Sequence, residues 1–268
     1  MPELPEVEIV RRGIAPVIVG QTIDDVIVRE RRLRLPVTPQ LRQKTRGQQI
    51  REVRRRGKYL LIDLEGSVLI IHLGMSGTLY FSPKPPTRKH EHIGWKIGDV
   101  FLIYNDPRRF GCVVWSSSAP ETHPLLCLLG PEPLSPTFDG IVLRQALKNK
   151  RTSIKTALLN GHIVVGVGNI YASESLHKAS IHPQTPAHRI GNVRSSRLAD
   201  SIKIILHQAI DAGGSTIRNF TNVEQASGYF QVQWQVYGRG GQPCTCGGTV
   251  RQFKQNGRST YYCPRCQR

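Results

Sequence analysis

The sequence predicts an α+β protein in which a leading helix and a β-sandwich precede a helical region and a C-terminal zinc-ribbon hairpin. Three observations indicate this class. Strand-like apolar runs occupy the first 115 or so residues, helical spacing begins after about residue 138, and four cysteines lie within the last 25 residues. The chain of 268 residues, 39% apolar and 21% charged, is long enough for two modest globular domains.

The leading helix begins in the stretch MPELPEVE, which contains two prolines and three carboxylates. The second proline and the acidic residues are typical of a helix start, because proline suits the first turn and acids oppose the positive end of the dipole. Apolar residues at helical spacing follow at Val7, Val10 and Ile14. We expect Gly13 with Pro16 to end this helix. A helix start does not account for Pro2.

The sandwich is predicted from two long apolar stretches. The first, YLLIDLEGSVLIIHLGMSGTLYF, contains a strand, a turn at Glu65-Gly66, a second strand, and a third after Gly74. The second, VFLIYNDPRRFGCVVW, repeats the strand-turn-strand scheme around Asp106-Pro107. Antiparallel strands this apolar predict two packed sheets. Cys112 and Cys127 lie in apolar runs, and we expect both to be buried.

The helical region follows a proline-rich linker at 116–138, in which we expect a short helical piece. Thr152 or Ser153 can cap a helix that runs to Asn160 and closes at Gly161, and Asn169 can cap another that runs to about Ala179. A third helix is expected over about 196–212. The connection GHIVVGVGN between the first two is glycine-rich, so it is either a tight turn or a phosphate site made of backbone amides.

The charge indicates a polyanionic partner. Thirty-seven Lys and Arg residues against nineteen Asp and Glu residues give a formal net charge of +18, and no acidic residue follows Glu224. Nucleic acid is favoured over membrane, because no basic amphipathic anchor helix is visible and no apolar run approaches a membrane span. With no signal-peptide pattern at the start, we expect a cytosolic protein.

The last four cysteines form two pairs, Cys244/Cys246 and Cys263/Cys266, separated by sixteen residues that contain Asn256-Gly257 between two strands. Asn-Gly between strands is a strong hairpin signal, so we interpret the segment as a zinc ribbon that binds one structural Zn²⁺. The first pair has only one intervening residue where two are usual, and Gly247-Gly248 can absorb the difference through unusual torsions. Arg258 follows the turn directly and is expected at the tip of the hairpin.

Ordered motifs along the whole chain resemble one family. MPELPEVE, RGKYLLI, HLGMSGTL, DPRRFG, VVGVGNIYASE, SGYF, VYGR and GRSTYYCPRCQ resemble formamidopyrimidine-DNA glycosylase, a bifunctional 8-oxoguanine glycosylase and AP lyase. The resemblance implies a DNA-repair enzyme that removes oxidised purines, 8-oxoguanine and formamidopyrimidines, from duplex DNA by base excision and cuts the strand by β,δ-elimination. It further implies a monomer that acts in the bacterial cytosol or nucleoid.

The resemblance also assigns catalytic residues. Removal of Met1 would expose the amine of Pro2 as nucleophile, and an α-amino group with a pKa of roughly 7.7 to 8.0 has far more free base at neutral pH than lysine. Glu3 matches the acid that protonates the sugar ring oxygen. Lys58 matches a second catalytic cation in β-elimination, and Arg258 the residue of δ-elimination. Glu6 either tunes the amine or only compensates the helix dipole.

The DNA contacts implied by the resemblance are Met75, Arg108 and Phe110, which would fill the gap left by an extruded base, and His90, Lys150 and Asn169. The segment at 161–169 resembles the family's helix-two-turn-helix, and 215–231 its loop over the extruded base. We therefore expect three domains: a catalytic β-sandwich with the N-terminal proline at 2–130, a helical DNA-binding domain at 131–234, and a zinc-finger hairpin at 235–268. The metal ligands would be Cys244, Cys246, Cys263 and Cys266.

Two other interpretations remain open. An enzyme similar to endonuclease VIII would share the nucleophile but prefer oxidised pyrimidines. A non-catalytic zinc-ribbon DNA-binding protein would explain the charge and the cysteines, but it would not explain the Pro-Glu terminus.

Overall fold

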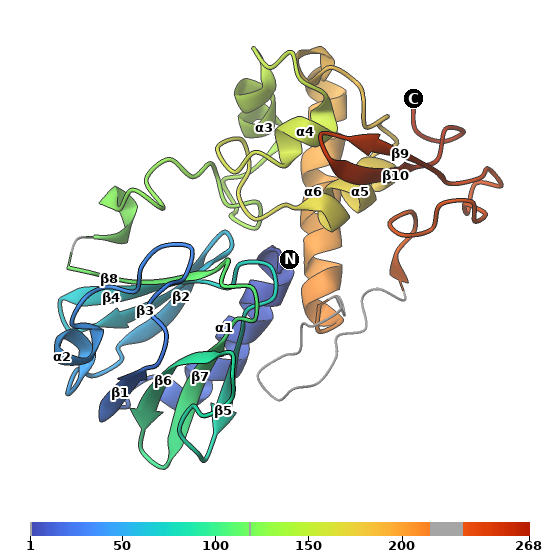
Figure 1. Cartoon of the computed structure of the whole chain (residues 1–268). Coiled ribbons are helices and arrows are strands. Elements are labelled where there is room, and N and C mark those ends of the chain that lie inside the picture. Colours follow the sequence, from blue (N-terminus) through green and yellow to red (C-terminus); the bar gives the residue numbers. More distant parts are fainter. Residues whose placement is uncertain (1, 118, 215–232) are drawn as a thin grey trace. The chain divides into compact units, whose positions relative to one another are not determined.

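The structure, a computed structural model, describes residues 2–117, 119–214 and 233–268, which form two compact units (Figure 1). Among the described residues, the first unit comprises 2–117, 119–127 and 212–214, and the second comprises 128–211 and 233–268. The division into three domains stays a prediction, and the loop expected at 215–231 lies outside the described residues. Within the described ranges, no helix has both the length and the apolar character needed to cross a membrane.

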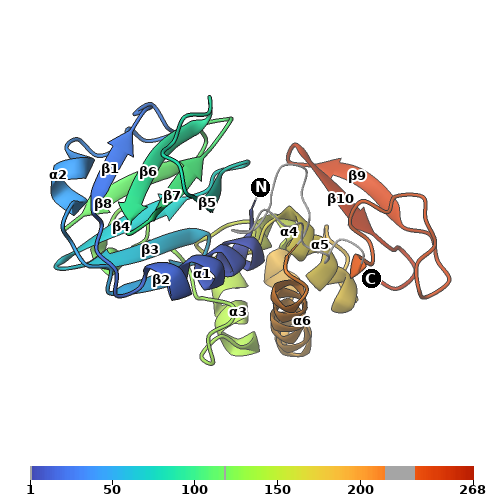
Figure 2. The ribbon, with the colours of Figure 1, turned by 90° about the horizontal axis from the view of Figure 1, so that it is seen from below.

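The first unit contains two helices, eight strands and a short 3₁₀ turn among its described residues. They are α1 (Leu4–Ile18), β1 (Asp25–Val28), α2 (Leu41–Thr45), β2 (Glu52–Arg56), β3 (Tyr59–Leu64), β4 (Ser67–His72), β5 (Thr78–Ser82), β6 (Glu91–Ile97), β7 (Val100–Asn105), β8 (Cys112–Ser116) and η1 (Pro120–Thr122). One sheet has the order β1-β6-β7-β5 and the other β2-β3-β4-β8, with antiparallel neighbours throughout. These layers are the predicted β-sandwich, and they are visible in Figure 2.

The inner faces of both sheets share one core with α1. Apolar side chains from the two sheets, such as Ile62 and Trp95, pack in the same buried cluster as Val10 and Ile14 of the helix. Alternation of side chains along each strand puts these residues on one face, and burial of their apolar surface stabilises the sandwich. The core therefore fixes the first helix, and with it the start of the chain, against the sheets.

Helix α1 is longer than the sequence predicts, because it continues through Gly13 and Pro16 to Ile18. Proline in the last turn removes only one backbone hydrogen bond, and the amide of Val19 still donates to Ala15 at 3.0 Å. Ile14 and Ile18 are fully buried in the core, which offsets this loss. The expected helix end was wrong because tertiary packing outweighs the local breakers.

The stretch around Asp106-Pro107 also differs from the expected scheme. β7 pairs with β5 and β6, whereas β8 pairs with β4, so this connection crosses from one sheet to the other. Cys112 is buried as expected, but Cys127 is exposed, because Leu126 occupies the buried position in that turn. A pattern of apolar residues does not state which sheet receives a strand.

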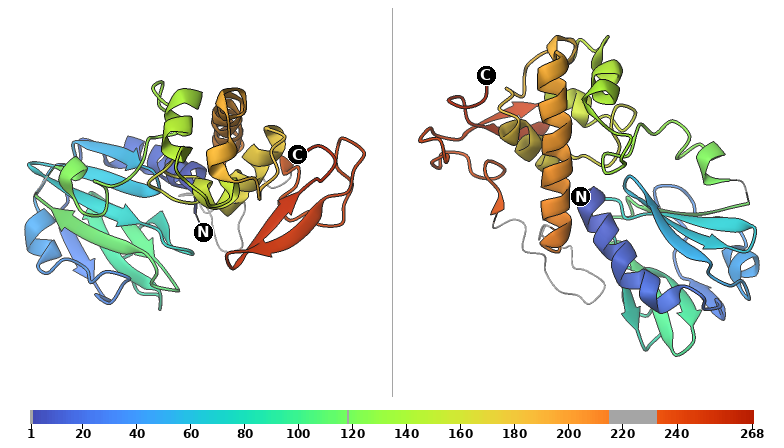
Figure 3. Two further views of the ribbon diagram at one scale, coloured as in Figure 1. Left: turned by 90° about the horizontal axis from the view of Figure 1, so that it is seen from above. Right: turned by 180° about the vertical axis from the view of Figure 1, so that it is seen from behind.

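The second unit contains helices packed around α6 and a two-stranded hairpin (Figure 3). Its elements are α3 (Gly140–Leu147), α4 (Ile154–Leu158), α5 (Asn169–Lys178), η2 (Ala187–Arg189), α6 (Asn192–Asp211), β9 (Arg251–Gln255) and β10 (Arg258–Tyr262). Helix α6 packs against both α3 and α5 and begins four residues earlier than expected. Helix α3, capped by Asp139, is a helix that the sequence analysis missed.

Helix α4 has the predicted cap, since the Ser153 side chain accepts from the amide of Thr156. The predicted cap of α5 was wrong. Gly168, with extended backbone, is the N-cap, and Asn169 is the first helical residue. The Asn169 side-chain amide instead donates to the carbonyl of Ser259, 3.0 Å away in β10. The Asn169 side chain, which the sequence suggests as a local helix cap, thus forms a long-range hydrogen bond instead.

Candidate functional site

The start of the chain is buried and held by hydrogen bonds. Pro2 is buried, and Glu3 is the extended N-cap of α1. The Glu3 amide donates to the Glu6 carboxylate at 2.8 Å, one half of a capping box in which the Glu3 side chain accepts from the Glu6 backbone. Both carboxylates are at least 97% buried. The terminus is therefore ordered, unlike the loose ends of most domains.

Gly214 closes over the same place within the first unit. It has a φ of +82°, and a Cβ there would lie 2.9 Å from Ile9 and 3.5 Å from the Glu6 carboxylate. Only glycine combines this backbone conformation with so close an approach. The position of Glu6 is therefore fixed by the helix start and by the chain that follows α6.

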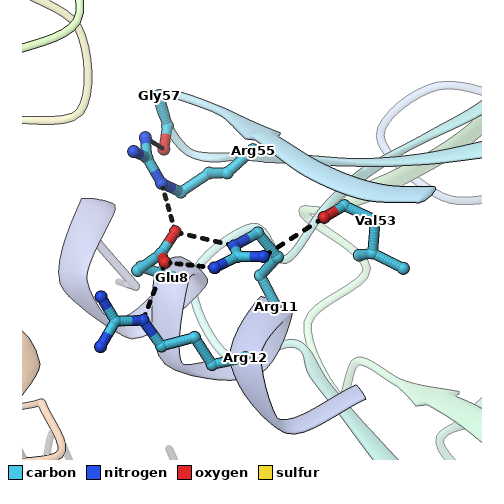
Figure 4. Close-up of polar contacts among 6 residues, drawn as sticks. All are labelled: Glu8, Arg11, Arg12, Val53, Arg55 and Gly57. Carbon is cyan, nitrogen blue, oxygen red and sulfur yellow. Dashed lines mark hydrogen bonds and ion pairs between the residues drawn. The ribbon is translucent and has the colours of Figure 1, made fainter. Parts of the chain in front are cut away.

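A cluster of ion-paired side chains around Glu8 fixes the next turn of α1 to β2 (Figure 4). Glu8 accepts hydrogen bonds from Arg11 at 2.8 and 3.1 Å, from Arg12 at 2.9 Å and from Arg55 at 3.0 Å. Burial alone would raise the pKa of Glu8, but the hydrogen bonds from Arg11 and Arg12 and the charge of Arg55 outweigh it and lower the pKa to about 2. Glu8 is thus a carboxylate at any physiological pH.

The same cluster reaches the turn that carries Lys58. Arg55 donates to the carbonyl of Gly57 at 3.2 Å, and Gly57 has a φ of +57°, as the two-residue turn between β2 and β3 requires. Lys58, half-buried, follows directly. The sequence analysis missed Glu8 and Arg55, since the pairing depends on contact between α1 and β2, 47 residues apart.

His72 is a neutral residue beside this turn. Burial, together with the positive charges of Arg34 and Lys58, lowers its pKa to about 3. Its Nδ1 accepts from the amide of Gly74 at 2.9 Å, and its ring packs on Tyr59 with centroids 4.8 Å apart. His72 therefore fixes the beginning of the turn that carries Met75.

Two turns present the residues predicted to enter DNA. A Cβ on Gly74, which has a φ of +65°, would lie 2.4 Å from the amide nitrogen of Gly111, so the turns meet backbone to backbone. Met75 and Phe110 are 40% and 46% exposed, and the Arg108 guanidinium lies 4.6 Å from the centre of the Phe110 ring. The structure brings these three predicted residues together on adjoining turns.

Asp106 organises both turns. Its carboxylate, fully buried, accepts from the Gly111 amide at 2.8 Å, from the Ser76 hydroxyl at 3.2 Å and from the Arg108 amide at 3.3 Å. Its own amide donates to the carbonyl of His90 at 3.0 Å. The sequence indicated only a turn at Asp106, but the buried carboxylate links the Met75 turn to the Phe110 turn.

His90, half-exposed, borders a surface hollow of about 360 Å³ whose lining includes Arg29, Lys89 and Arg109. Glu30 and Glu91 also contribute to this lining. Hydrogen bonds occupy both carboxylates: Glu30 accepts from Arg32 and Arg109, and Glu91 accepts from the amides of residues 87 and 88. The hollow is suited to an anionic group, because its basic side chains outnumber its acids.

In the second unit, α4 and α5 hold the hairpin. Asn256 donates to Thr156 at 3.0 Å, and the buried Lys155 donates to the Ser259 carbonyl at 3.0 Å and to Thr260 at 2.7 Å. The turn has the left-handed backbone expected of Asn-Gly, with φ of 48° and 74°. Arg258 is exposed beside this turn on a well-held hairpin.

Two predicted DNA contacts differ in their surroundings. Lys150 is exposed just after α3, and its carbonyl accepts from the amide of His188 at 3.0 Å. Asn169 is half-buried, and its Oδ1 has no hydrogen-bond partner among the described residues.

The connection at 161–169 buries Ile163, Val164 and Val165, whose amides bond to protein carbonyls. Its use as a phosphate site stays a prediction.

The four late cysteines form a group that fits a metal ion. Their sulfurs lie within 4.8 Å of one another, with Cys244 and Cys266 at 4.0 Å and Cys246 and Cys263 at 3.5 Å. Thiolates bound at 2.3 Å around tetrahedral zinc lie about 3.8 Å apart, so the cysteine positions suit zinc. The shortened first pair thus reaches the other two cysteines.

The two glycines after this pair make the arrangement possible. Gly247 has a φ of +78°, and a Cβ on Gly248 would lie 2.9 Å from the Cys263 sulfur. The amide of Gly248 also lowers the pKa of the Cys246 thiol, which favours the thiolate that a metal binds. The expectation that these glycines absorb the missing residue agrees with this geometry.

Comparison with protein families covers nearly the whole chain. Residues 1–113 match the formamidopyrimidine-DNA glycosylase N-terminal domain, residues 129–221 the H2TH domain of the same enzyme, and residues 241–268 a zinc finger found in FPG and IleRS. The formamidopyrimidine-DNA glycosylases of Methylococcus capsulatus and Paraburkholderia phymatum are each 50% identical, over 100% of both chains.

Solved structures agree. Lactococcus lactis Fpg in complex with abasic-site DNA is similar with a TM-score of 0.91 and 37% identity, covering 99% of each chain. A mutant of the same protein, bound to DNA that contains Fapy-dG, has a TM-score of 0.91 over 100% of both chains. The MutM (Fpg) protein from Thermus thermophilus is similar with a TM-score of 0.89 and 36% identity, covering 99% of this chain and 98% of that one.

Proposed function

The chain belongs to the formamidopyrimidine-DNA glycosylase family, and from that premise we propose that Pro2 is the nucleophile with which it excises oxidised purines from duplex DNA. The enzyme is a base-excision-repair glycosylase with AP lyase activity, and it carries one structural zinc. The observation that carries the assignment of Pro2 is its buried place at the capped start of α1. We place the enzyme in the bacterial cytosol, with its DNA.

The reaction follows from a secondary amine at that place. After removal of Met1, the Pro2 nitrogen bonds to the anomeric carbon of the damaged nucleotide, and the glycosidic bond breaks as the base leaves with a proton. Glu3, next to the nucleophile, protonates the sugar ring oxygen as the bond between that oxygen and the anomeric carbon breaks, and the nitrogen lone pair completes a C=N bond in the opened sugar. The resulting iminium is cationic at any pH. It acidifies the adjacent sugar carbon, so loss of that proton expels the 3′ phosphate and a second elimination expels the 5′ phosphate.

The remaining site residues bind DNA or assist elimination. Lys58, on the turn held by Arg55, supplies the cation for β-elimination, and Arg258, at the hairpin tip, serves δ-elimination. Bound zinc supplies the cross-link that keeps the small hairpin folded. His90, Lys150 and Asn169 contact the DNA.

Met75, Arg108 and Phe110 fill the gap left when the damaged base is extruded. Their exposure supports this role, because large apolar side chains at the surface are available to enter a base stack. The Arg108 cation can then meet the orphaned partner base.

Borohydride trapping tests the assignment of Pro2. Reduction should link the enzyme covalently to a duplex that contains 8-oxoguanine, and Pro2→Gly should trap far less than a control variant, Pro136→Gly, in the exposed proline-rich connection. Undiminished trapping by Pro2→Gly, or full activity with Met1 retained, would refute the assignment of Pro2 as nucleophile.

A thymine glycol duplex separates the alternative functions. Preferential trapping on that duplex indicates an enzyme similar to endonuclease VIII, and no trapping on either duplex indicates a DNA-binding protein without catalytic activity.

A further inference from the structure

The metal-binding end of the hairpin has a neighbour that no sequence motif indicated. His177, in the last turn of α5, places its Nε2 atom 3.3 Å from the Cys244 sulfur. The two residues are 67 positions apart in the chain. The contact therefore joins a helix of the second unit to the first cysteine of the shortened pair.

His177 faces this sulfur at hydrogen-bond distance through a ring nitrogen. An imidazole carries at least one ring N–H, and its Nε2 atom is the one that lies against the sulfur. A thiolate is a strong acceptor, and an N–H to sulfur distance of 3.3 Å suits a hydrogen bond. The four cysteine sulfurs already fit a tetrahedron among themselves, so the imidazole is not needed as a ligand.

The shortened cysteine pair, Cys244/Cys246, explains why a side-chain donor is useful at this place. Within the Cys-Thr-Cys segment, the amide of Cys246 faces the Cys244 sulfur and the amide of Gly248 faces the Cys246 sulfur. The amide of Gly247 is occupied elsewhere, since it donates to the carbonyl of Cys244 at 2.9 Å. A side chain from another element adds the support that one residue fewer in the knuckle leaves out.

Helix α5 is a firm base for such support. One turn earlier, Glu174 is 99% buried, and its carboxylate accepts from the amides of Gln235, Val236 and Tyr237 at 2.8 to 3.0 Å. These bonds tie the chain just before the cysteines to the helix that carries His177. The imidazole is therefore held close to its target rather than free to turn away.

We propose that His177 is a positioning residue of the metal site, which donates its Nε2–H to the Cys244 thiolate and holds the shortened knuckle in metal-binding geometry. Hydrogen bonds to metal ligands commonly change metal affinity by about 10-fold to 100-fold. The inference concerns the metal site alone and does not depend on Pro2 or on any step of the reaction.

Metal release from the full-length zinc protein tests the proposal. Transfer of zinc to a chromophoric chelator should be about tenfold faster in His177→Phe, which keeps the ring but lacks the donor. His177→Gln, whose amide can donate, should restore most of the wild-type rate. The control is His182→Phe, because His182 packs edge-on against Tyr262 and a phenyl ring can keep that contact. Its release rate should equal that of the wild type.

Cobalt substitution gives a readout that loose packing would not imitate. Removing an N–H donor raises electron density on the sulfur, so the thiolate-to-cobalt charge-transfer band of His177→Phe should move to lower energy, and that of His177→Gln should return toward the wild-type position. Equal release rates and an unshifted band in His177→Phe would overturn the proposal. If His177→Phe loads no metal at all, loading restored by His177→Gln supports it, and loading absent in both variants overturns it.

Discussion

Glu8→Gln should destabilise the first unit, and the cost should disappear in acid. The glutamine keeps the size of the side chain but removes the charge that Arg11, Arg12 and Arg55 share. Three guanidinium groups would then lie close together with no carboxylate among them. The Arg55 side chain, which also holds the carbonyl of Gly57, would lose its anchor on α1.

The magnitude follows from the pKa of Glu8. Lowering it from 4.5 to about 2 corresponds to about 3.4 kcal/mol, at about 1.36 kcal/mol for each pH unit. Arg12 is more than half exposed, and solvent screening reduces its share, so we expect a loss of about 2 to 3 kcal/mol at pH 7. Because the folded-state pKa is lowered, this stability is complete above pH 4.5 and is lost as the pH falls toward 2.

Urea unfolding of wild type and variant between pH 7 and pH 2.5 measures the difference. The two free energies of unfolding should be farthest apart at pH 6 to 7 and should converge below about pH 3. Glu65→Gln is the matched control, since Glu65 pairs with Arg51 at an exposed turn and should cost at most about 1 kcal/mol. A Glu8→Gln cost that is the same at pH 3 as at pH 7, or no larger than that of the control, would refute the reasoning.

Four other predictions concern the turns, the DNA interface and the metal. Gly74→Ala should cost about 3 kcal/mol in urea unfolding, because its Cβ would meet the Gly111 backbone, whereas Gly66→Ala, with a similar φ and open space, should cost about 1. DNA affinity should fall steeply with salt in a binding titration, and a flat response would contradict a phosphate-dominated interface. Arg258→Ala should leave base release intact and accumulate the β-elimination product on a gel; an unchanged product ratio, equal to that of Arg251→Ala, would exclude its role. Chelation of zinc should abolish DNA binding in a mobility-shift assay, and an active metal-free preparation would contradict a structural metal.

Local sequence signals predicted the elements whose formation is itself local. Asn256-Gly257 predicted the hairpin turn and Ser153 predicted the cap of α4, because a turn and a cap each depend on residues within a few positions. The two-sheet class followed from apolar strands. By contrast, Asn169 was misjudged as a cap, since its side chain bonds to a strand 90 residues away.

The supporting residues of the candidate site could not be found in this way. Glu8, Asp106 and His177 act through partners on other elements, and a single acidic or imidazole side chain on a helix or turn is common on any surface. Their one shared signal, burial of a polar group in a satisfied network, exists only after folding. Met75 and Phe110 were named by the resemblance, and the structure shows both side chains exposed, as their positions in turns suggest.

These supports share a physical purpose at the start of the chain. The proposed nucleophile, Pro2 after removal of Met1, would have one neighbour in sequence instead of two, and chain ends normally fray. Here the Glu3–Glu6 capping box orders the first turn, Gly214 closes over Glu6, and Glu8 binds the second turn to β2 through Arg55. Because a reacting atom displaced by about 1 Å can lose about 100-fold in rate, we expect residues that hold α1 to matter to catalysis without touching DNA.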